Sequence, residues 1–144
     1  YLPGDEFSTY VFAEKGKMIY CISNLRQKLD DYHSFEAKIQ NNEKIEIMCR
    51  KIIKELELTS NINIQFKNSK NKVPKLIEIN PRIGGTIILP SISGINLPYL
   101  AIKQCLNEKI PTTKKSKSTQ MIRYTKELFL KDSKFFEINK NLKI

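Results

Sequence analysis

The chain has 144 residues, 40% of them hydrophobic, which is enough to fill one domain core but not two. No apolar run approaches the roughly 18 residues of a membrane span, and residues 1–5 lack the charged start and apolar stretch of a signal peptide. We therefore expect a cytoplasmic protein with no membrane partner.

The three cysteines, Cys21, Cys49 and Cys105, are an odd number, lie far apart and form no CxxC pair. This pattern indicates neither a disulfide framework nor a zinc site. We expect reduced, mostly buried thiols.

The net charge of +10 is unevenly distributed along the chain. Residues 109–144 contain ten lysines or arginines and three acidic residues, so this stretch carries +7 and the preceding body +3. In the basic tail, at about 112–144, lysines are scattered among Ser, Thr and Asn without regular aromatic residues. Such a pattern is typical of a solvated surface rather than of a groove that follows the phosphates of a nucleic acid, so we do not expect nucleic acid as a partner.

The sequence opens with a predicted hairpin and a polar connection. Residues 6–13 alternate as a strand, and residues 18–23 form its partner after a turn. Residues 24–40 are polar and irregular, and we expect a long connection that is either mobile or functional. A helix follows, capped by Asn41 or Asn42, with its core face at three-to-four spacing. The residues on that face are Ile45, Met48, Ile52 and Leu56.

Two more strands and a second helix are predicted downstream. The strands cover residues 61–67 and 73–80, joined by a turn. Residues 97–106 form the helix, with Pro98 in its first turn. A further strand within 120–130 and a ragged last dozen residues complete the prediction.

The hairpin of residues 61–67 and 73–80 carries the clearest chemistry. In one register, a face gathers polar side chains and the other face is apolar. The polar pairs are Gln65 with Glu78 and Asn63 with Asn80; the apolar pairs are Ile64 with Ile79 and Phe66 with Ile77.

Such a polar face suits magnesium, which takes oxygen ligands and is commonly held by one or two carboxylates together with phosphates and water. One glutamate beside amides would bind it well only once ATP supplied more negative charge. Arg82 is placed to meet a phosphate, and Gly84-Gly85-Thr86 permits a close backbone approach. On spacing alone, a solvated polar face followed by a routine turn explains the same pattern.

Three segments resemble one superfamily. Glu78-Ile79-Asn80-Pro81-Arg82 resembles the ExNPR segment of ATP-grasp enzymes, and Asn63-Ile64-Gln65-Phe66 resembles the NVQF strand of carbamoyl-phosphate synthase large chains. Residues 1–8 resemble the strand-and-hinge segment in which this superfamily holds adenosine.

The resemblance implies roles on the hairpin. Gln65, Glu78 and Asn80 would face Mg²⁺, with Mn²⁺ as an alternative metal, and the first two would also belong to the ATP site. Arg82 would contact the phosphates or an acyl-phosphate, and Asn63 is the second catalytic candidate.

The resemblance also implies nucleotide contacts elsewhere. Glu6 would accept hydrogen bonds from the ribose hydroxyls, and Leu2 would lie against adenine; the ordinary alternatives are an exposed carboxylate and a strand-edge apolar residue. Asn24, Arg26 and His33 lie in the connection that crosses near the triphosphate in this superfamily. For Arg26 a solvated loop position, and for His33 a surface or core position, remain open.

The sequence departs from the carbamoyl-phosphate synthase pattern after residue 82. Those enzymes typically continue with a stretch containing serine and arginine, whereas this chain has Ile83-Gly84-Gly85-Thr86. This favours an amino acid or other small carboxylate as substrate over bicarbonate or carbamate. The usual N-terminal half, with its nucleotide-covering lysines, is not recognisable, so we expect residues 1–144 to be one domain from a longer protein.

We expect an α+β fold, an antiparallel sheet flanked by helices on one side, as in the C-terminal subdomain of the ATP-grasp fold. The parent enzyme would activate a carboxylate as an acyl-phosphate and couple it to an amine, with ATP, a small carboxylate and the rest of the module as partners. The isolated chain would be inactive, and a homodimer is left open. Two alternatives remain: a basic module that binds nucleic acid or another polyanion, and a non-catalytic nucleotide-binding relative.

Overall fold

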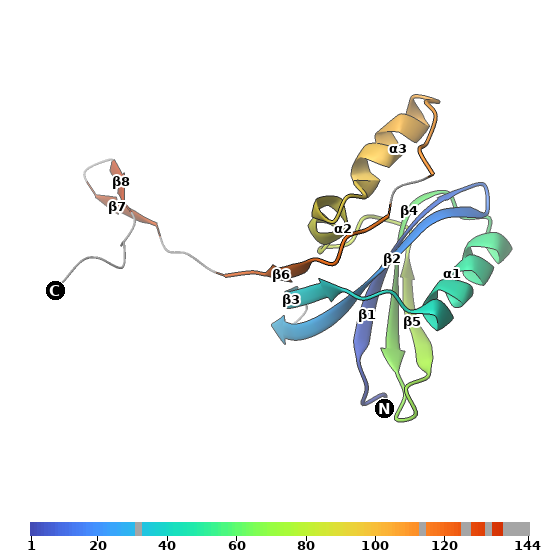
Figure 1. Ribbon diagram of the computed structural model, residues 1–144. Coiled ribbons are helices and arrows are strands. Elements are labelled where there is room, and N and C mark those ends of the chain that lie inside the picture. The colour runs from blue at the N-terminus through green and yellow to red at the C-terminus, as the bar shows by residue number, and fades with distance from the viewer. Residues whose placement is uncertain (31–32, 113–114, 125–127, 132–133, 137–144) are drawn as a thin grey trace.

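The computed structural model describes residues 1–30, 33–112, 115–124, 128–131 and 134–136; of these, residues 28–30, 33–35, 131 and 134–136 are described by their backbone alone. Its main feature is a six-stranded antiparallel sheet with the order β5-β4-β1-β2-β3-β6 (Figure 1). The strands are β1 (Glu6–Glu14), β2 (Lys17–Asp30), β3 (His33–Ile39), β4 (Ser60–Asn68), β5 (Pro74–Asn80) and β6 (Gln120–Ile122). A separate two-stranded sheet joins β7 (Phe129–Lys131) to β8 (Lys134–Phe136).

Helices cover both faces of the large sheet, which confirms the α+β class but not the expected placement on one side. Helix α1 (Glu43–Glu55) packs on one face, and α2 (Ile88–Ile92) and α3 (Leu97–Cys105) pack on the other (Figure 1). The reason is the central strand β1, in which Val11 belongs to the α1 core while Tyr10 and Phe12 belong to the α3 core. A strand buried on both faces needs cover on both.

Helix α1 begins at one of the two predicted caps, but of its predicted core face only Ile45 is fully buried, while Met48 and Ile52 are partly buried. The Asn42 side chain accepts a hydrogen bond from the Ile45 N–H and caps the helix. Ile45, Cys49 and Ile53 are fully buried against the sheet. Leu56 was expected in this core, but it is the C-cap residue and is 56% exposed.

The predicted connection at 24–40 is wrong. Strand β2 continues to Asp30 and pairs with β3, and β3 pairs with β6. The polar sequence is compatible with strands because pairing satisfies the backbone groups, whatever the side chains are. In this strand arrangement, Arg26 is the direct partner of Glu6 and reaches the face of the sheet that is not covered by α1.

The β4–β5 hairpin has the predicted register at its chemically important end. Gln65 faces Glu78 and Asn63 faces Asn80. A bulge next to these pairs shifts the register, so Phe66 faces Leu76 rather than Ile77. Ile77, expected in the apolar core, is half exposed.

The glycine segment after β5 is anchored to the sheet by Tyr10. The Tyr10 phenol oxygen accepts a hydrogen bond from the Thr86 N–H at 3.0 Å and shares another with the Thr86 hydroxyl at 2.6 Å. Gly84 packs so closely that a Cβ would lie 2.9 Å from Asn63 Cγ and 3.0 Å from the Tyr10 ring. Only glycine fits there.

The remaining surface features are ordinary for a folded domain. No helix among the described residues is long and apolar enough to cross a membrane.

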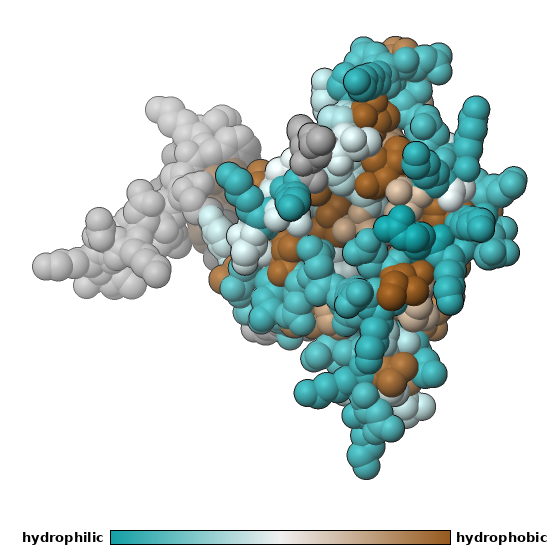
Figure 2. All heavy atoms as spheres, turned by 45° about the vertical axis from the view of Figure 1, so that its right-hand side comes forward, coloured by the Kyte–Doolittle hydropathy of each residue, from teal (hydrophilic) through white to brown (hydrophobic). Residues whose placement is uncertain are grey.

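Cys49 is buried, Cys21 is partly buried and Cys105 is exposed, all as free thiols. A hydrogen bond with Cys49 and burial raise the pKa of Cys21. Hydrophilic side chains cover most of the face in Figure 2, with hydrophobic residues in several patches among them.

Replacing Ile53 with Ala should reduce the free energy of unfolding by about 2 to 5 kcal/mol, because it opens a cavity between α1 and the sheet. Ile47 is a matched control on the same helix: Ile53 is 0% exposed and Ile47 is 50% exposed. Ile47→Ala should cost less than about 1 kcal/mol. Urea unfolding of chain 1–144 measures both, and equal losses would contradict this packing of α1.

Tyr10→Phe should cost about 1 to 3 kcal/mol near pH 7, because the buried Thr86 N–H loses its acceptor. Burial raises the pKa of Tyr10, although its bonds with Thr86 and the charges of Arg26 and Arg123 act in the opposite direction. The unfolded chain therefore loses the phenol proton first, and the wild type should lose stability above about pH 10, so its advantage over Tyr10→Phe narrows there. Unfolding curves at pH 7 and pH 11 test this, with the exposed Tyr124→Phe as a control that should show neither effect.

Candidate functional site

Cross-strand ladders place polar side chains in rows on the face opposite α1. One row runs from Glu78 through Gln65 and Ser8 to Asn24 across four strands, because each neighbour is a direct register partner. The flanking rows are Asn80, Asn63 and Tyr10 on one side, and Lys67, Glu6 and Arg26 on the other. Since direct partners share a face and lie about 5 Å apart, these side chains form one continuous polar surface.

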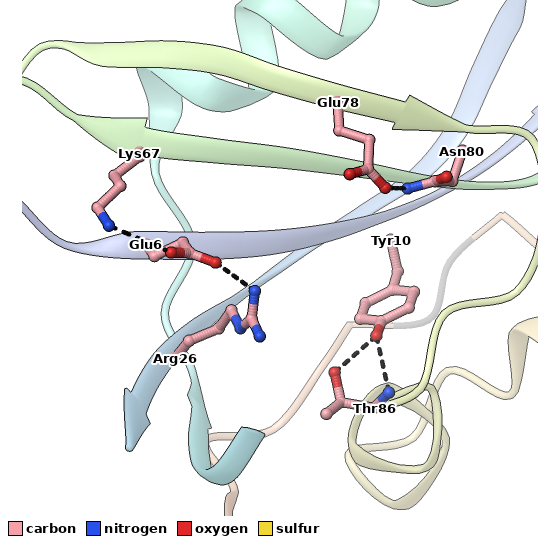
Figure 3. A network of polar contacts seen from close by, with 7 residues as sticks. All are labelled: Glu6, Tyr10, Arg26, Lys67, Glu78, Asn80 and Thr86. Carbon is pink, nitrogen blue, oxygen red and sulfur yellow. Dashed lines mark hydrogen bonds and ion pairs between the residues drawn. The ribbon is translucent and has the colours of Figure 1, made fainter. Parts of the chain in front are cut away.

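Glu6 lies between two cations on this surface. It forms an ion pair with Arg26 and a second with Lys67 Nζ at 3.5 Å (Figure 3). The side chains of Glu6 and Arg26 are only 16% and 10% exposed, so water screens the first pair weakly. This pairing fixes Glu6 at the rim of the site, where its predicted contact with ribose remains a prediction.

Oxygen ligands for a hard cation lie on neighbouring positions of β4 and β5. The Asn80 amide N–H₂ donates to one oxygen of the Glu78 carboxylate, which leaves the Asn80 amide oxygen and the second Glu78 oxygen available (Figure 3). Gln65 is the direct partner of Glu78. One carboxylate and two amide oxygens match the preference of Mg²⁺, so these residues fit the metal that the ExNPR resemblance implies.

Next to these oxygens is a pocket of about 290 Å³. Its lining residues are Ser8, Tyr10, Arg26, Asn63, Gln65, Arg82, Gly84, Gly85, Thr86 and Arg123. Three guanidinium groups and no Asp or Glu side chain occur among these described residues. The pocket therefore favours an anionic ligand.

Backbone contacts orient two of these arginines. Arg82 Nη1 donates to the Ile83 carbonyl at 3.0 Å, and Arg123 Nη2 donates to the Gly85 carbonyl at 2.6 Å. Each bond uses one of five N–H donors on the guanidinium, so the others can face a ligand.

Asn63 and the glycine segment add neutral donors. Asn63 is 2% exposed, and its Nδ2 has no hydrogen-bond partner among the described residues. A buried donor without a partner costs free energy unless a ligand or water satisfies it. Gly85 has open space where a side chain would stand, so a ligand can approach its backbone closely.

Some predicted site residues do not reach the pocket. Leu2 lies half-buried before β1 and is not part of the lining. Asn24 belongs to β2 rather than to a loop, and it is completely buried, with no hydrogen-bond partner for its side-chain amide in the described part of the chain. His33 begins β3, and its side chain lies outside the described residues, so its role remains a prediction.

Three lining residues were missed by sequence reasoning: Ser8, Tyr10 and Arg123. Ser8 could have been found, because it follows Glu6 at period two on the same strand. Arg123 could not, because only the pairing of β6 with β3 brings this stretch of the basic tail to the site.

Solved structures with this fold are enzymes by their titles, and one of the titles names an ATPase subunit. The ATPase subunit of phosphoribosylaminoimidazole carboxylase from Aquifex aeolicus has a TM-score of 0.69 at 13% identity, covering 85% of this chain and 41% of that one. Phosphoribosylglycinamide synthetase from Anaerococcus prevotii has a TM-score of 0.62 at 19% identity, covering 76% and 30%. L-amino acid ligase from Bacillus licheniformis has a TM-score of 0.55 at 18% identity, covering 74% and 30%. The chain thus spans less than half of each of these proteins, and the identities establish only the fold.

No curated protein matches the sequence. The sequence model for the family described as "ATP-grasp in the biosynthetic pathway with Ter operon" matches residues 1–128, which is most of the chain. The match includes β1 to β6, the polar rows and every residue that lines the pocket beside them. The chain therefore belongs to this ATP-grasp family.

Proposed function

We propose that this chain forms the ATP- and Mg²⁺-binding wall of an ATP-grasp ligase that activates a carboxylate as an acyl-phosphate and transfers the acyl group to an amine. The observation that carries the proposal is the register of β4 and β5, which aligns Gln65, Glu78 and Asn80 beside a pocket lined with arginines. An anionic pocket ligand next to oxygen ligands for a cation suits a Mg²⁺-nucleotide.

Each side chain has a separate task in this scheme. Glu78, Asn80 and Gln65 would hold Mg²⁺, which when bound neutralises negative charge on the phosphates. Arg82 would stabilise charge on the oxygens of the transferred phosphoryl group, because a guanidinium pairs with phosphate through two hydrogen bonds. Asn63, with its unpaired buried N–H, would donate to an oxygen of the phosphate or of the substrate carboxylate.

The glycine segment would shape the part of the site that receives the carboxylate substrate. Gly84 lets the backbone pack against Asn63 and Tyr10, and Gly85 leaves room for a small substrate above it. The Tyr10–Thr86 bonds hold this segment in place, so the approach of the substrate is defined by rigid neighbours. No enzyme nucleophile is required, because phosphate activates the acyl group. The substrate would be an amino acid or another small carboxylate, because Ile83-Gly84-Gly85-Thr86 replaces the serine- and arginine-containing stretch that is typical of carbamoyl-phosphate synthases.

Glu78→Ala and Asn80→Ala in the full-length protein should reduce ATP-dependent turnover at least about 100-fold while leaving the fold intact, because both side chains project from the edge strand rather than pack in the core. Release of phosphate measures turnover, and circular dichroism checks the fold. Glu55→Ala, which removes an exposed carboxylate from α1, should behave as the wild type. Normal turnover in both site variants would remove the basis for the metal site.

The isolated chain 1–144 should fold and bind Mg²⁺-ATP weakly, with no catalysis. Both cores lie within the chain, so folding needs nothing else. Catalysis also needs a second subdomain on the other side of the nucleotide, which excludes water and positions the carboxylate substrate. Calorimetry should detect binding that disappears with EDTA, and phosphate release above background from carboxylates and amines would falsify the claim of inactivity.

A further inference from the structure

One cation of the pocket comes from the opposite edge of the sheet to the metal-binding residues. Arg82 follows β5 and Arg123 follows β6, and these are the two outer strands of the six-stranded sheet. Both arginines nevertheless line the same pocket. Arg82 donates to the Ile83 carbonyl and Arg123 to the Gly85 carbonyl, so two guanidinium groups from opposite edges of the sheet meet at the same glycine segment.

The charge of Arg123 is not used by the proposed chemistry. Glu6 forms an ion pair with Arg26, and Arg82 is assigned to the phosphoryl group. The hydrogen bond of Arg123 goes to the Gly85 carbonyl, which orients the guanidinium without cancelling its charge. No Asp or Glu among the described residues lines the pocket to compensate it.

We propose that Arg123 determines specificity by binding a second anionic group of the substrate whose carboxylate is activated, so that this substrate is a dicarboxylate or a similar dianion. The inference rests on the proposed function and adds the substrate class. The reacting carboxylate would lie on the side of Arg82, and the second anionic group would meet Arg123 through two parallel N–H···O bonds. Arg123 is partly buried and oriented by its bond to Gly85, so it discriminates against an analogue that lacks the matching anion, because its charge then stays unpaired.

Binding of small acids to the full-length protein, loaded with Mg²⁺ and ADP, tests this inference by calorimetry. The probes are succinate, glutarate and adipate, which vary the separation of two carboxylates, with acetate and butyrate as single-charge comparisons. At least one dicarboxylate should bind about tenfold more tightly than either monocarboxylate. Arg123→Gln should abolish that preference while changing the affinity for ADP by less than about threefold.

Two further variants separate recognition from a structural role. Arg123→Lys keeps the charge but loses the planar fork, so it should retain only part of the preference. Arg50→Gln is the matched control, because Arg50 pairs with Glu46 on α1, away from the pocket, and it should change nothing.

The outcomes separate the two proposals. If Arg123→Gln weakens ADP and all acids equally, Arg123 only holds the Gly85 segment and the inference is wrong. It is also wrong if the wild type shows no preference for any dicarboxylate, or if Arg123→Gln keeps the preference. Failure of the wild type to bind Mg²⁺ and ADP would overturn the proposed function, and this inference with it.

Discussion

The burial of β1 on both faces is the constraint on which the rest of the structure depends. Seven of its nine residues are buried, and the five hydrophobic ones alternate between the α1 core and the α3 core. A shift of one residue would exchange the two faces and place Glu6 and Ser8 against α1. The two cores therefore fix the register of β1, and β1 in turn fixes β2 and β4 through direct pairing. The polar rows of the site follow from that register.

The sequence could predict the hairpin chemistry because its apolar residues alternate regularly around Ile64 and Ile79. The pairing of Gln65 with Glu78 follows from that alternation. The bulge beyond it could not be predicted, because Leu76 and Ile77 are adjacent apolar residues and either could have opposed Phe66. The error did not reach the site, since the bulge lies on the turn side of Glu78.

Two other features depend on contacts far apart in the sequence. Residues 24–40 read as a connection because their side chains are polar, yet β1 and β6 supply the partners that make them strands. The position of Arg123 depends on the same pairing, and composition alone placed it in a solvated tail. Local patterns thus identified the metal-binding candidates, which occupy one hairpin, but not Arg123, which long-range pairing brings to the pocket.

The charges of the site imply that cation and anion binding are coupled. Glu78 is the only carboxylate among the proposed metal ligands, and the neighbouring pocket is positive. Alone, Mg²⁺ would meet weak ligands and repulsion from the arginines, whereas a bound triphosphate would supply both oxygen ligands and negative charge. Bound Mg²⁺ must likewise raise the affinity for the triphosphate, because each ligand raises the affinity for the other by the same factor. On the proposed function, the chain therefore recognises the metal–nucleotide complex rather than either component, and its single carboxylate is sufficient for that task.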